Sequence, residues 1–187
     1  TRFIIISNRA TAKMAWRDFE GAYEDLMLSY NFDSTDMAVL VNLGAMCDEV
    51  GRGDETLKYL LKAVEIDPTF SSPYANIGYK YQHMGEYEKA IKYYNKVLEL
   101  DPNEPLGFSN RSFNLYKLGK LKDAMEDINK SIELYPTNSY AYKVRALIHI
   151  ANKKDEKACE DLDIAIELGY TQQYGEEVQQ LINANCK

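Results

Sequence analysis

One stretch, SSPYANIGYKYQHMGEYEKAIKYYNKVLELDPNE at residues 71–104, decides the fold because its pattern recurs along the chain. The next 34 residues, 105–138, read PLGFSNRSFNLYKLGKLKDAMEDINKSIELYPTN and keep the same order of small, bulky and charged positions. The prolines and glycines that recur at this spacing are Pro68, Pro102, Pro136, Gly51, Gly85 and Gly119. Self-similarity at a fixed period of this length is the signature of a repeat protein in which successive units stack.

The period divides most of the chain into four tandem blocks, 37–70, 71–104, 105–138 and 139–172, in which we number positions from 1. Two positions carry small residues. At position 8 these are Gly44, Gly78, Ser112 and Ala146, and at position 20 they are Thr56, Ala90, Ala124 and Ala158. Positions 4 and 24 carry large apolar or aromatic residues throughout, from Leu40 and Leu60 in the first of these blocks onward. Small side chains at two fixed positions would let two helices of a block approach closely, and the large side chains would fill the space beside that contact.

The end of each predicted helix has its own signal. Glycine at position 15 suits the left-handed conformation that ends a helix, so we expect positive φ at Gly85 and Gly119. Proline at position 32 follows the second helix, which cannot continue through it. Because one pair of helices cannot bury its own apolar face, neighbouring blocks must stack into a solenoid.

This pattern resembles the tetratricopeptide repeat (TPR) family, in which bulky, Leu-Gly, Tyr, Ala, Phe and Pro residues stand at these offsets. The clearest copy has Tyr74, Ile77, Gly78, Tyr81, Ala90, Tyr94 and Pro102. The resemblance covers the four tandem blocks without an insertion. It implies an all-α, right-handed superhelical solenoid of helix–turn–helix repeats that works as an interaction module and presents a concave groove to a partner.

The same frame extends to both ends of the chain. A divergent repeat fits residues 3–36, although Arg17 stands where glycine is expected and Ser34 where proline is expected. After the last block, Val178, Leu181 and Ile182 have helical spacing, which predicts a capping helix at about 175–186. We therefore expect a single TPR domain over residues 1–187.

Charge and cysteine content restrict the kinds of partner and the cellular compartment that we expect for the protein. The net charge is -7 and the sequence pI is about 5.0, which argues against nucleic acid and anionic membranes as partners. The three cysteines, Cys47, Cys159 and Cys186, have no paired spacing and do not indicate a disulfide framework or a zinc site. We therefore expect a reducing, cytoplasmic compartment, while a start at Thr1 leaves a removed leader or a trimmed chain open.

No motif in the sequence brings together side chains that could catalyse a reaction or bind a cofactor or metal ion. We interpret His149 at position 11 as a residue that fills a core slot, because Cys47 holds this position in another block. The glycines occupy turn positions rather than a phosphate-binding loop, and Cys159 has no histidine or cysteine at ligand spacing. We therefore assign no catalytic, cofactor-binding or metal-binding residue and expect a protein that is not an enzyme.

The candidate binding residues lie on the predicted first helices. Position 6 carries asparagine in four successive repeats, and an amide offers both a donor and an acceptor to the backbone of an extended peptide. Aromatic side chains occupy neighbouring positions on the same presumed face, where tyrosine supplies contact area with a polar tip. The candidate partner-binding residues are Asn8, Asn42, Asn76, Tyr79, Asn110, Phe113, Tyr116 and Tyr140.

The sequence favours a scaffold or adaptor that binds a protein or an extended peptide in its groove. Two alternatives remain open. The chain could be a stoichiometric inhibitor or immunity-type protein that blocks one enzyme, or it could be a regulatory subunit of an enzyme. The asparagine at position 6 could also reflect a family preference rather than binding. Neither the partner nor the oligomeric state follows from the sequence.

Overall fold

A computed structural model describes residues 2–186, with side chains from residue 5 onward. Every regular element in this part of the chain is a helix, and the chain divides into two compact units, Thr1–Met84 and Gly85–Lys187. The boundary falls within the block at 71–104, so each unit is described separately. The expectation of one domain over the whole chain remains a prediction.

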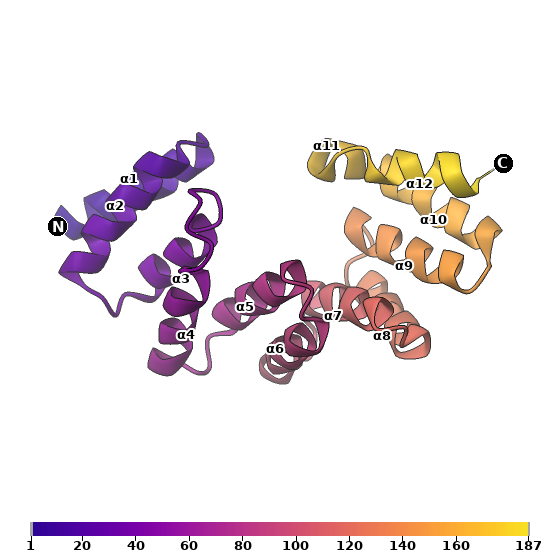
Figure 1. The fold of residues 1–187 in the computed structure, drawn as a ribbon, viewed down its shortest axis with the longest axis horizontal. Helices are drawn as coiled ribbons and strands as arrows, with labels where there is room; N and C mark the ends of the chain where they lie inside the picture. The colour runs from indigo at the N-terminus through magenta and orange to yellow at the C-terminus, as the bar shows by residue number, and fades with distance from the viewer. Residues whose placement is uncertain (1, 187) are drawn as a thin grey trace. The chain divides into compact units, whose positions relative to one another are not determined.

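The first unit consists of two helix pairs followed by a fifth helix (Figure 1). Its helices are α1 (Arg2–Ala15), α2 (Phe19–Phe32), α3 (Met37–Met46), α4 (Thr56–Ile66) and α5 (Ser71–His83). Helix α1 packs on α2, α3 packs on α4, and α5 packs against both α3 and α4. Fully buried side chains between them, among them Leu26, Leu43 and Tyr59, form the core of this unit.

The second unit has a longer series of helices. They are α6 (Tyr87–Leu100), α7 (Pro105–Lys117), α8 (Leu121–Leu134), α9 (Ser139–Ala151), α10 (Asp155–Glu167), α11 (Tyr170–Tyr174) and α12 (Glu177–Asn185). Helix α7 packs between α6 and α8, and α9 packs between α8 and α10. Helix α12 covers α10 through buried Val178, as the capping role of this segment requires. The short α11 between them was not predicted.

The first helices begin where the sequence blocks begin, at Met37, Ser71, Pro105 and Ser139. Local hydrogen bonds explain three of these starts. The side chains of Asp36, Glu104 and Asn138 each accept a hydrogen bond from a backbone N–H in the first turn of the following helix. These bonds satisfy donors that the helix itself leaves unpaired. The repeat frame deduced from the sequence is therefore also the frame of the helices.

In every repeat, the residue at position 15, in the turn between the two helices, has a left-handed backbone conformation with positive φ. The φ angles are 69° at Gly51, 75° at Gly85 and 72° at Gly119, which confirms the expectation for the last two. Arg17 and Lys153 occupy the same position with φ of 61° and 57°. The turn therefore keeps its geometry even where the residue carries a Cβ that disfavours it.

Close helix contacts occur at the small positions, as predicted. Ala90 and Ala124 are both 0% exposed. In one repeat the Ser112 hydroxyl donates a hydrogen bond to the carbonyl of Ala124 over 2.7 Å, which joins positions 8 and 20 directly. In another, a Cβ added at Gly44 would lie 2.5 Å from the Leu60 side chain. Larger residues at position 8 would therefore push the paired helices apart.

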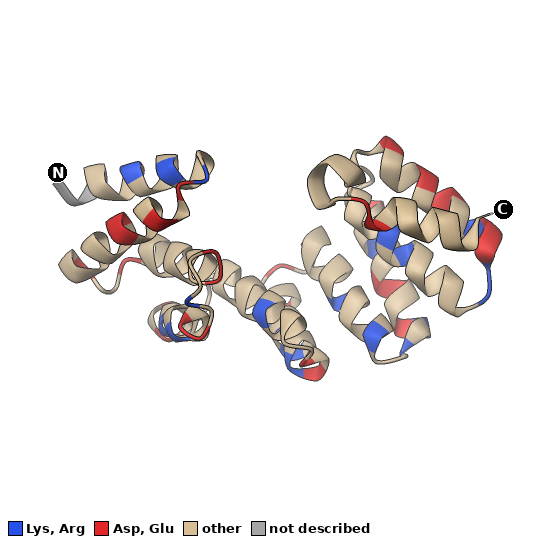
Figure 2. Cartoon of the chain, turned by 45° about the horizontal axis from the view of Figure 1, so that its top comes forward, with Lys and Arg blue, Asp and Glu red and all other residues tan. Residues whose placement is uncertain are grey.

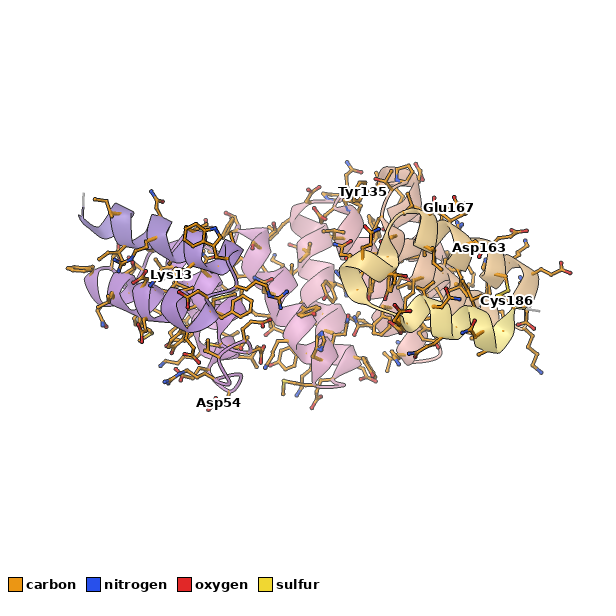
Figure 3. All side chains as sticks on the ribbon, turned by 90° about the horizontal axis from the view of Figure 1, so that it is seen from above. Lys13, Asp54, Tyr135, Asp163, Glu167 and Cys186 are labelled. Atoms are coloured by element: carbon orange, nitrogen blue, oxygen red, sulfur yellow. A yellow bond between two sulfur atoms is a disulfide. The ribbon has the colours of Figure 1, made fainter. Side chains whose placement is uncertain are left out.

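The cysteine interpretation was wrong in one respect. Cys159 of α10 and Cys186 after α12 form a disulfide, and Figure 3 labels Cys186 at this end of the chain. Their spacing of 27 residues does not fit the 34-residue period, so the repeat pattern gave no sign of the pairing. Disulfides persist mainly in oxidising compartments. The cysteines therefore no longer support a cytoplasmic location, which remains a prediction.

The third cysteine and the core histidine behave as expected. Cys47 is free and 0% exposed, and burial raises the pKa of its thiol to about 11, so it stays a protonated core residue. The side chain of His149 is only 12% exposed, and its Nε2 lies 3.7 Å from Asp161 Oδ2. Burial lowers the pKa of His149, which favours the neutral imidazole that a core position requires.

Candidate functional site

The first helices of each unit supply a common surface. Helix α3 contacts α5 in the first unit, and α7 contacts α9 in the second, so side chains at equivalent positions of neighbouring first helices lie near one another. We call the face formed by positions 2, 5, 6, 9, 12 and 13 of these helices the first-helix surface. Each unit carries its own part of this surface, with different side chains.

In the first unit the predicted amides lie on three successive first helices. Asn8 on α1 is exposed, and Asn42 on α3 and Asn76 on α5 are partly exposed. None of these three side-chain amides has a hydrogen-bond partner within residues 2–186. The asparagines therefore do not link neighbouring helices, and their donors and acceptors face solvent.

Tyr79 lies beyond the amides on α5 and is 54% exposed. Its ring lies against that of His83, with 4.2 Å between the ring centroids. Partial burial and the nearby carboxylates Asp48 and Glu49 raise the pKa of the Tyr79 hydroxyl. Lys80 pairs with Asp48 beside it. Tyr79 therefore keeps its hydroxyl proton, and its exposed side chain lies near acidic groups.

In the second unit the predicted aromatic residues form a cluster. The ring centroid of Phe113 lies 6.3 Å from that of Tyr116 on the same helix and 6.4 Å from that of Tyr140 on α9. Tyr174 of α11 extends the cluster, with its centroid 6.0 Å from that of Tyr140. Asn110 lies one helical turn before Phe113 on α7 and is partly exposed. The structure therefore brings Asn110, Phe113, Tyr116 and Tyr140 onto adjoining helices.

An ion pair between a buried lysine and an exposed glutamate closes one side of this cluster. The Lys143 side chain is only 5% exposed, and its Nζ lies 2.9 Å from Glu177 Oε1 on α12. The Tyr170 hydroxyl donates to Glu177 Oε2 over 3.0 Å. Burial alone would raise the pKa of Glu177, but the bond and charge of Lys143 outweigh it and the pKa lies below its ordinary value. Helix α12 thus covers the lysine that the first-helix surface would otherwise expose.

Lys117, at the end of α7, is the open cation of the cluster. Its Nζ lies 5.4 Å from the centroid of Phe113 and 6.0 Å from that of Tyr116. It is exposed and has no ion pair within the described part of the chain. Two aromatic faces therefore hold a positive charge that an incoming carboxylate could reach.

Comparisons with known proteins fit this geometry. Models of the tetratricopeptide repeat match residues 72–104 and residues 110–138. This chain is a tetratricopeptide repeat protein. No curated protein matches its sequence.

Solved structures show the same TPR solenoid. One neighbour is TTC0263, described as a thermophilic TPR protein in Thermus thermophilus; it has 13% identity, a TM-score of 0.78 and coverage of 98% of both chains. A MamA structure has 20% identity and a TM-score of 0.72 over 91% of this chain and 93% of that one. MamA from Desulfovibrio magneticus RS-1 has 14% identity and a TM-score of 0.76 over 92% and 98%. Together with the repeats, these neighbours support a protein–protein interaction scaffold.

The TPR helices are also joined by ion pairs that the sequence analysis missed. Arginine at position 7 pairs with aspartate at position 23 of the same repeat, through two hydrogen bonds each. The pairs are Arg9–Asp25, Arg111–Asp127 and Arg145–Asp161. Figure 2 shows basic residues on α1 and acidic residues on the neighbouring α2. The equal spacing of 16 residues was the available signal.

Two further observations on this TPR chain concern metal ions and membranes. Within the described residues, no group of three or more histidine, cysteine, aspartate or glutamate side chains could hold a metal ion. None of the described helices combines the length and the apolar character needed to cross a membrane. TPR proteins are in general interaction modules rather than catalysts.

Proposed function

We propose that this scaffold holds an extended peptide segment of a partner protein on its first-helix surfaces. The amides of Asn8, Asn42 and Asn76 would serve in the first unit, and Asn110 in the second. The observation that supports this most is that these partly or fully exposed amides have no partner in the described chain. An open amide can pair with both the N–H and the C=O of an extended backbone, whatever its side chains.

The aromatic cluster of the second unit would determine which side chains of the bound segment are preferred. Phe113, Tyr116 and Tyr140 would contact an aromatic or aliphatic residue of the segment, where rigid rings supply area at low entropic cost. Lys117 lies at the edge of these rings without an ion pair in the described chain. We infer that the segment carries a carboxylate next to its apolar residue. Tyr79 would play the corresponding contact role in the first unit.

Site-specific photo-cross-linking tests the proposal. The photoreactive residue p-benzoyl-phenylalanine replaces Tyr116 in one variant and Lys122 in the matched control. Lys122 lies on α8 with its side chain 89% exposed, outside the first-helix surface. We expect the partner to be captured at position 116 and not at position 122. Capture at position 122 alone would move the binding site to the second helices and reject the proposal.

The same experiment separates a scaffold from its alternatives. Several captured proteins that share an extended segment would support the scaffold. A single enzyme, bound one to one and losing activity in the complex, would indicate an inhibitor instead. An enzyme whose activity changes without being abolished would indicate a regulatory subunit.

A further inference from the structure

Helices α11 and α12 place an aromatic ring and a carboxylate on the first-helix surface of the second unit. The ring centroid of Tyr174 lies 6.0 Å from that of Tyr140 on α9. Three residues later, the carboxylate of Glu177 lies 2.9 Å from Nζ of Lys143, and the Tyr170 hydroxyl donates to its other oxygen. We call residues 170–177 the return segment. It occupies part of the surface to which we assign the partner.

The lysine of this ion pair also belongs to the aromatic cluster. Nζ of Lys143 lies 5.4 Å from the ring centroid of Phe113 and 5.7 Å from that of Tyr140. The charge of Lys117, the open cation of the cluster, acts on the carboxylate of Glu177 as well. Glu177 therefore lies beside two cations and two rings, where the proposed partner would bring its own carboxylate.

Helix α12 is held by a small apolar contact and a covalent bond. Among the residues of this helix only Val178 is buried, and Leu181 and Ile182 are partly buried beside it. The disulfide between Cys159 and Cys186 ties the end of the helix to α10, against which α12 packs (Figure 1). Once this cross-link is opened, the apolar contact and a half-exposed ion pair remain to keep the return segment in place.

We propose, on the premise that the function proposed above holds, that the return segment is an internal substitute for the partner and that the disulfide controls its replacement. The partner segment carries an aromatic residue followed closely by a carboxylate. These two groups meet Tyr140 and Lys143 in place of the chain's own residues. The surface is closed while Cys159 and Cys186 are cross-linked, and it opens to the partner when they are reduced.

Opening the surface requires a dithiol reductant. One thiolate of the reductant attacks a sulfur of the Cys159–Cys186 bond, and its second thiolate then displaces the protein from the mixed disulfide. Two electrons and two protons pass to the protein, so that both cysteines become thiols while the dithiol becomes a disulfide. The return segment therefore keeps the surface closed in an oxidising compartment and releases it in a reducing one.

Binding of a defined peptide to the full chain tests the proposal. The probe is a fluorescein-labelled peptide with the sequence of residues 169–185, which includes Tyr174 and Glu177 but no cysteine. Fluorescence anisotropy measures its affinity for the chain with the disulfide intact and for the same chain treated with dithiothreitol. We expect reduction to raise the affinity about tenfold or more, because the return segment then competes less well. The variant Cys159→Ser with Cys186→Ser should bind like the reduced chain, whether or not reductant is present.

Matched changes show which contact the peptide makes. A peptide with Glu177→Gln should bind the reduced chain about tenfold more weakly or worse, since it leaves Lys143 without a carboxylate. Glu176→Gln is the control peptide and should bind normally, because Glu176 is exposed and has no ion pair within the described residues. Adding Glu177→Gln to the chain that already carries both serines should strengthen binding of the unaltered peptide, because this change removes the competing carboxylate.

Three results would overturn the proposal. These are equal affinity with and without the disulfide, equal binding of the two variant peptides, and no binding even by the chain with Glu177→Gln and both serines. Cross-linking from position 116 of the reduced chain tests the proposed function separately. Capture there together with any of the three results would keep the proposed function and reject the internal substitute. Capture at position 122 alone would reject the proposed function, and with it this inference.

Discussion

The residue at position 15 of each repeat has a left-handed backbone conformation whether or not it is glycine. The geometry of the turn, rather than the residue type, therefore determines this conformation. Arg17 and Lys153 hold φ of 61° and 57° in the same turns that use glycine elsewhere. A residue with a Cβ is disfavoured in this region by roughly 1–2 kcal/mol. The two end repeats therefore carry a strain that the inner repeats avoid, and their sequences departed from the family pattern at this position.

Lys153→Gly should stabilise the second unit by about 0.5–1 kcal/mol. Glycine relieves the strained φ, although its larger entropy in the unfolded chain offsets part of the gain. The urea midpoint of the unfolding transition measures the effect. Arg17→Gly is the comparison, and it should gain less because Arg17 also lies over the ring of Phe19, 5.6 Å from its centroid. A lower midpoint for Lys153→Gly would contradict the strain argument.

Asp25 should make the first unit sensitive to acid. Its hydrogen bond with Arg9 holds the pKa of this carboxyl below its ordinary value, against burial, and Lys13 acts in the same direction. A lowered folded pKa stabilises the fold above the unfolded pKa of about 3.9, and this stability is lost as the pH falls through the folded pKa.

The acid dependence can be measured as the denaturation midpoint between about pH 6 and pH 2. Asp25→Asn should lower stability by roughly 1–3 kcal/mol at neutral pH and flatten the acid dependence. Parallel pH profiles for the two proteins would show that Asp25 does not contribute to the effect.

Helix α12 depends on both packing and a covalent link. Val178 is 0% exposed against the core of α10, and the disulfide ties Cys186 to Cys159 across 27 residues. A cross-link that closes a loop of this length stabilises a fold by about 2–4 kcal/mol, mainly by restricting the unfolded chain. Reduction should therefore loosen α12 before the rest of the second unit.

Hydrogen exchange with and without reductant tests this expectation. Amides of α12 should exchange faster after reduction, while those of α7 and α8 stay protected. The double variant Cys159→Ser with Cys186→Ser should exchange like the reduced protein and no longer respond to reductant. Unchanged protection of α12 in that variant would show that Val178 and its neighbours hold the helix unaided.

The sequence predicts those elements whose residues recur with the 34-residue period, and it fails to predict those that lie outside this repeat pattern. The family resemblance implied the helix pairs, and the small residues at positions 8 and 20 located their contact, because only small side chains fit where two helix backbones meet. The arginine–aspartate pairs were missed because position 7 is apolar at Leu43 and Ile77 but charged at Arg111. The disulfide lies outside the period. Helix α11 was missed because Tyr170 replaces the proline that marks the end of the other three tandem blocks.

The candidate site was predicted less completely than the fold. The family pattern identified Asn110, Phe113, Tyr116 and Tyr140, which the structure places on adjoining helices. It could not identify Glu177 or Tyr174, because these residues reach the site from the end of the chain, outside any repeat. Residues of α11 and α12 reach the site only because these helices pack back onto the last repeat. A repeat pattern of 34 residues does not encode this tertiary packing.

At the scale of the whole molecule, the asparagines of the first helices should contribute to binding and not to stability. Asn76→Ala with Asn110→Ala should leave thermal stability within about 0.5 kcal/mol of the parent, because both amides lack partners in the described chain. The same change should weaken partner binding by roughly 1–3 kcal/mol for each backbone group that it leaves unpaired in the complex. Calorimetry of unfolding and of binding on one protein sample gives both numbers.

Asn31→Ala is the matched control, since Asn31 is an exposed asparagine on the second helix of its repeat. It should change neither quantity. If the asparagines instead join neighbouring helices, the double variant loses stability and its weaker binding merely follows unfolding. If they reflect a family preference alone, the double variant keeps both its fold and its full affinity. In that case the aromatic cluster around Phe113 would have to bind the partner without the amides, and Phe113→Ala would become the decisive variant.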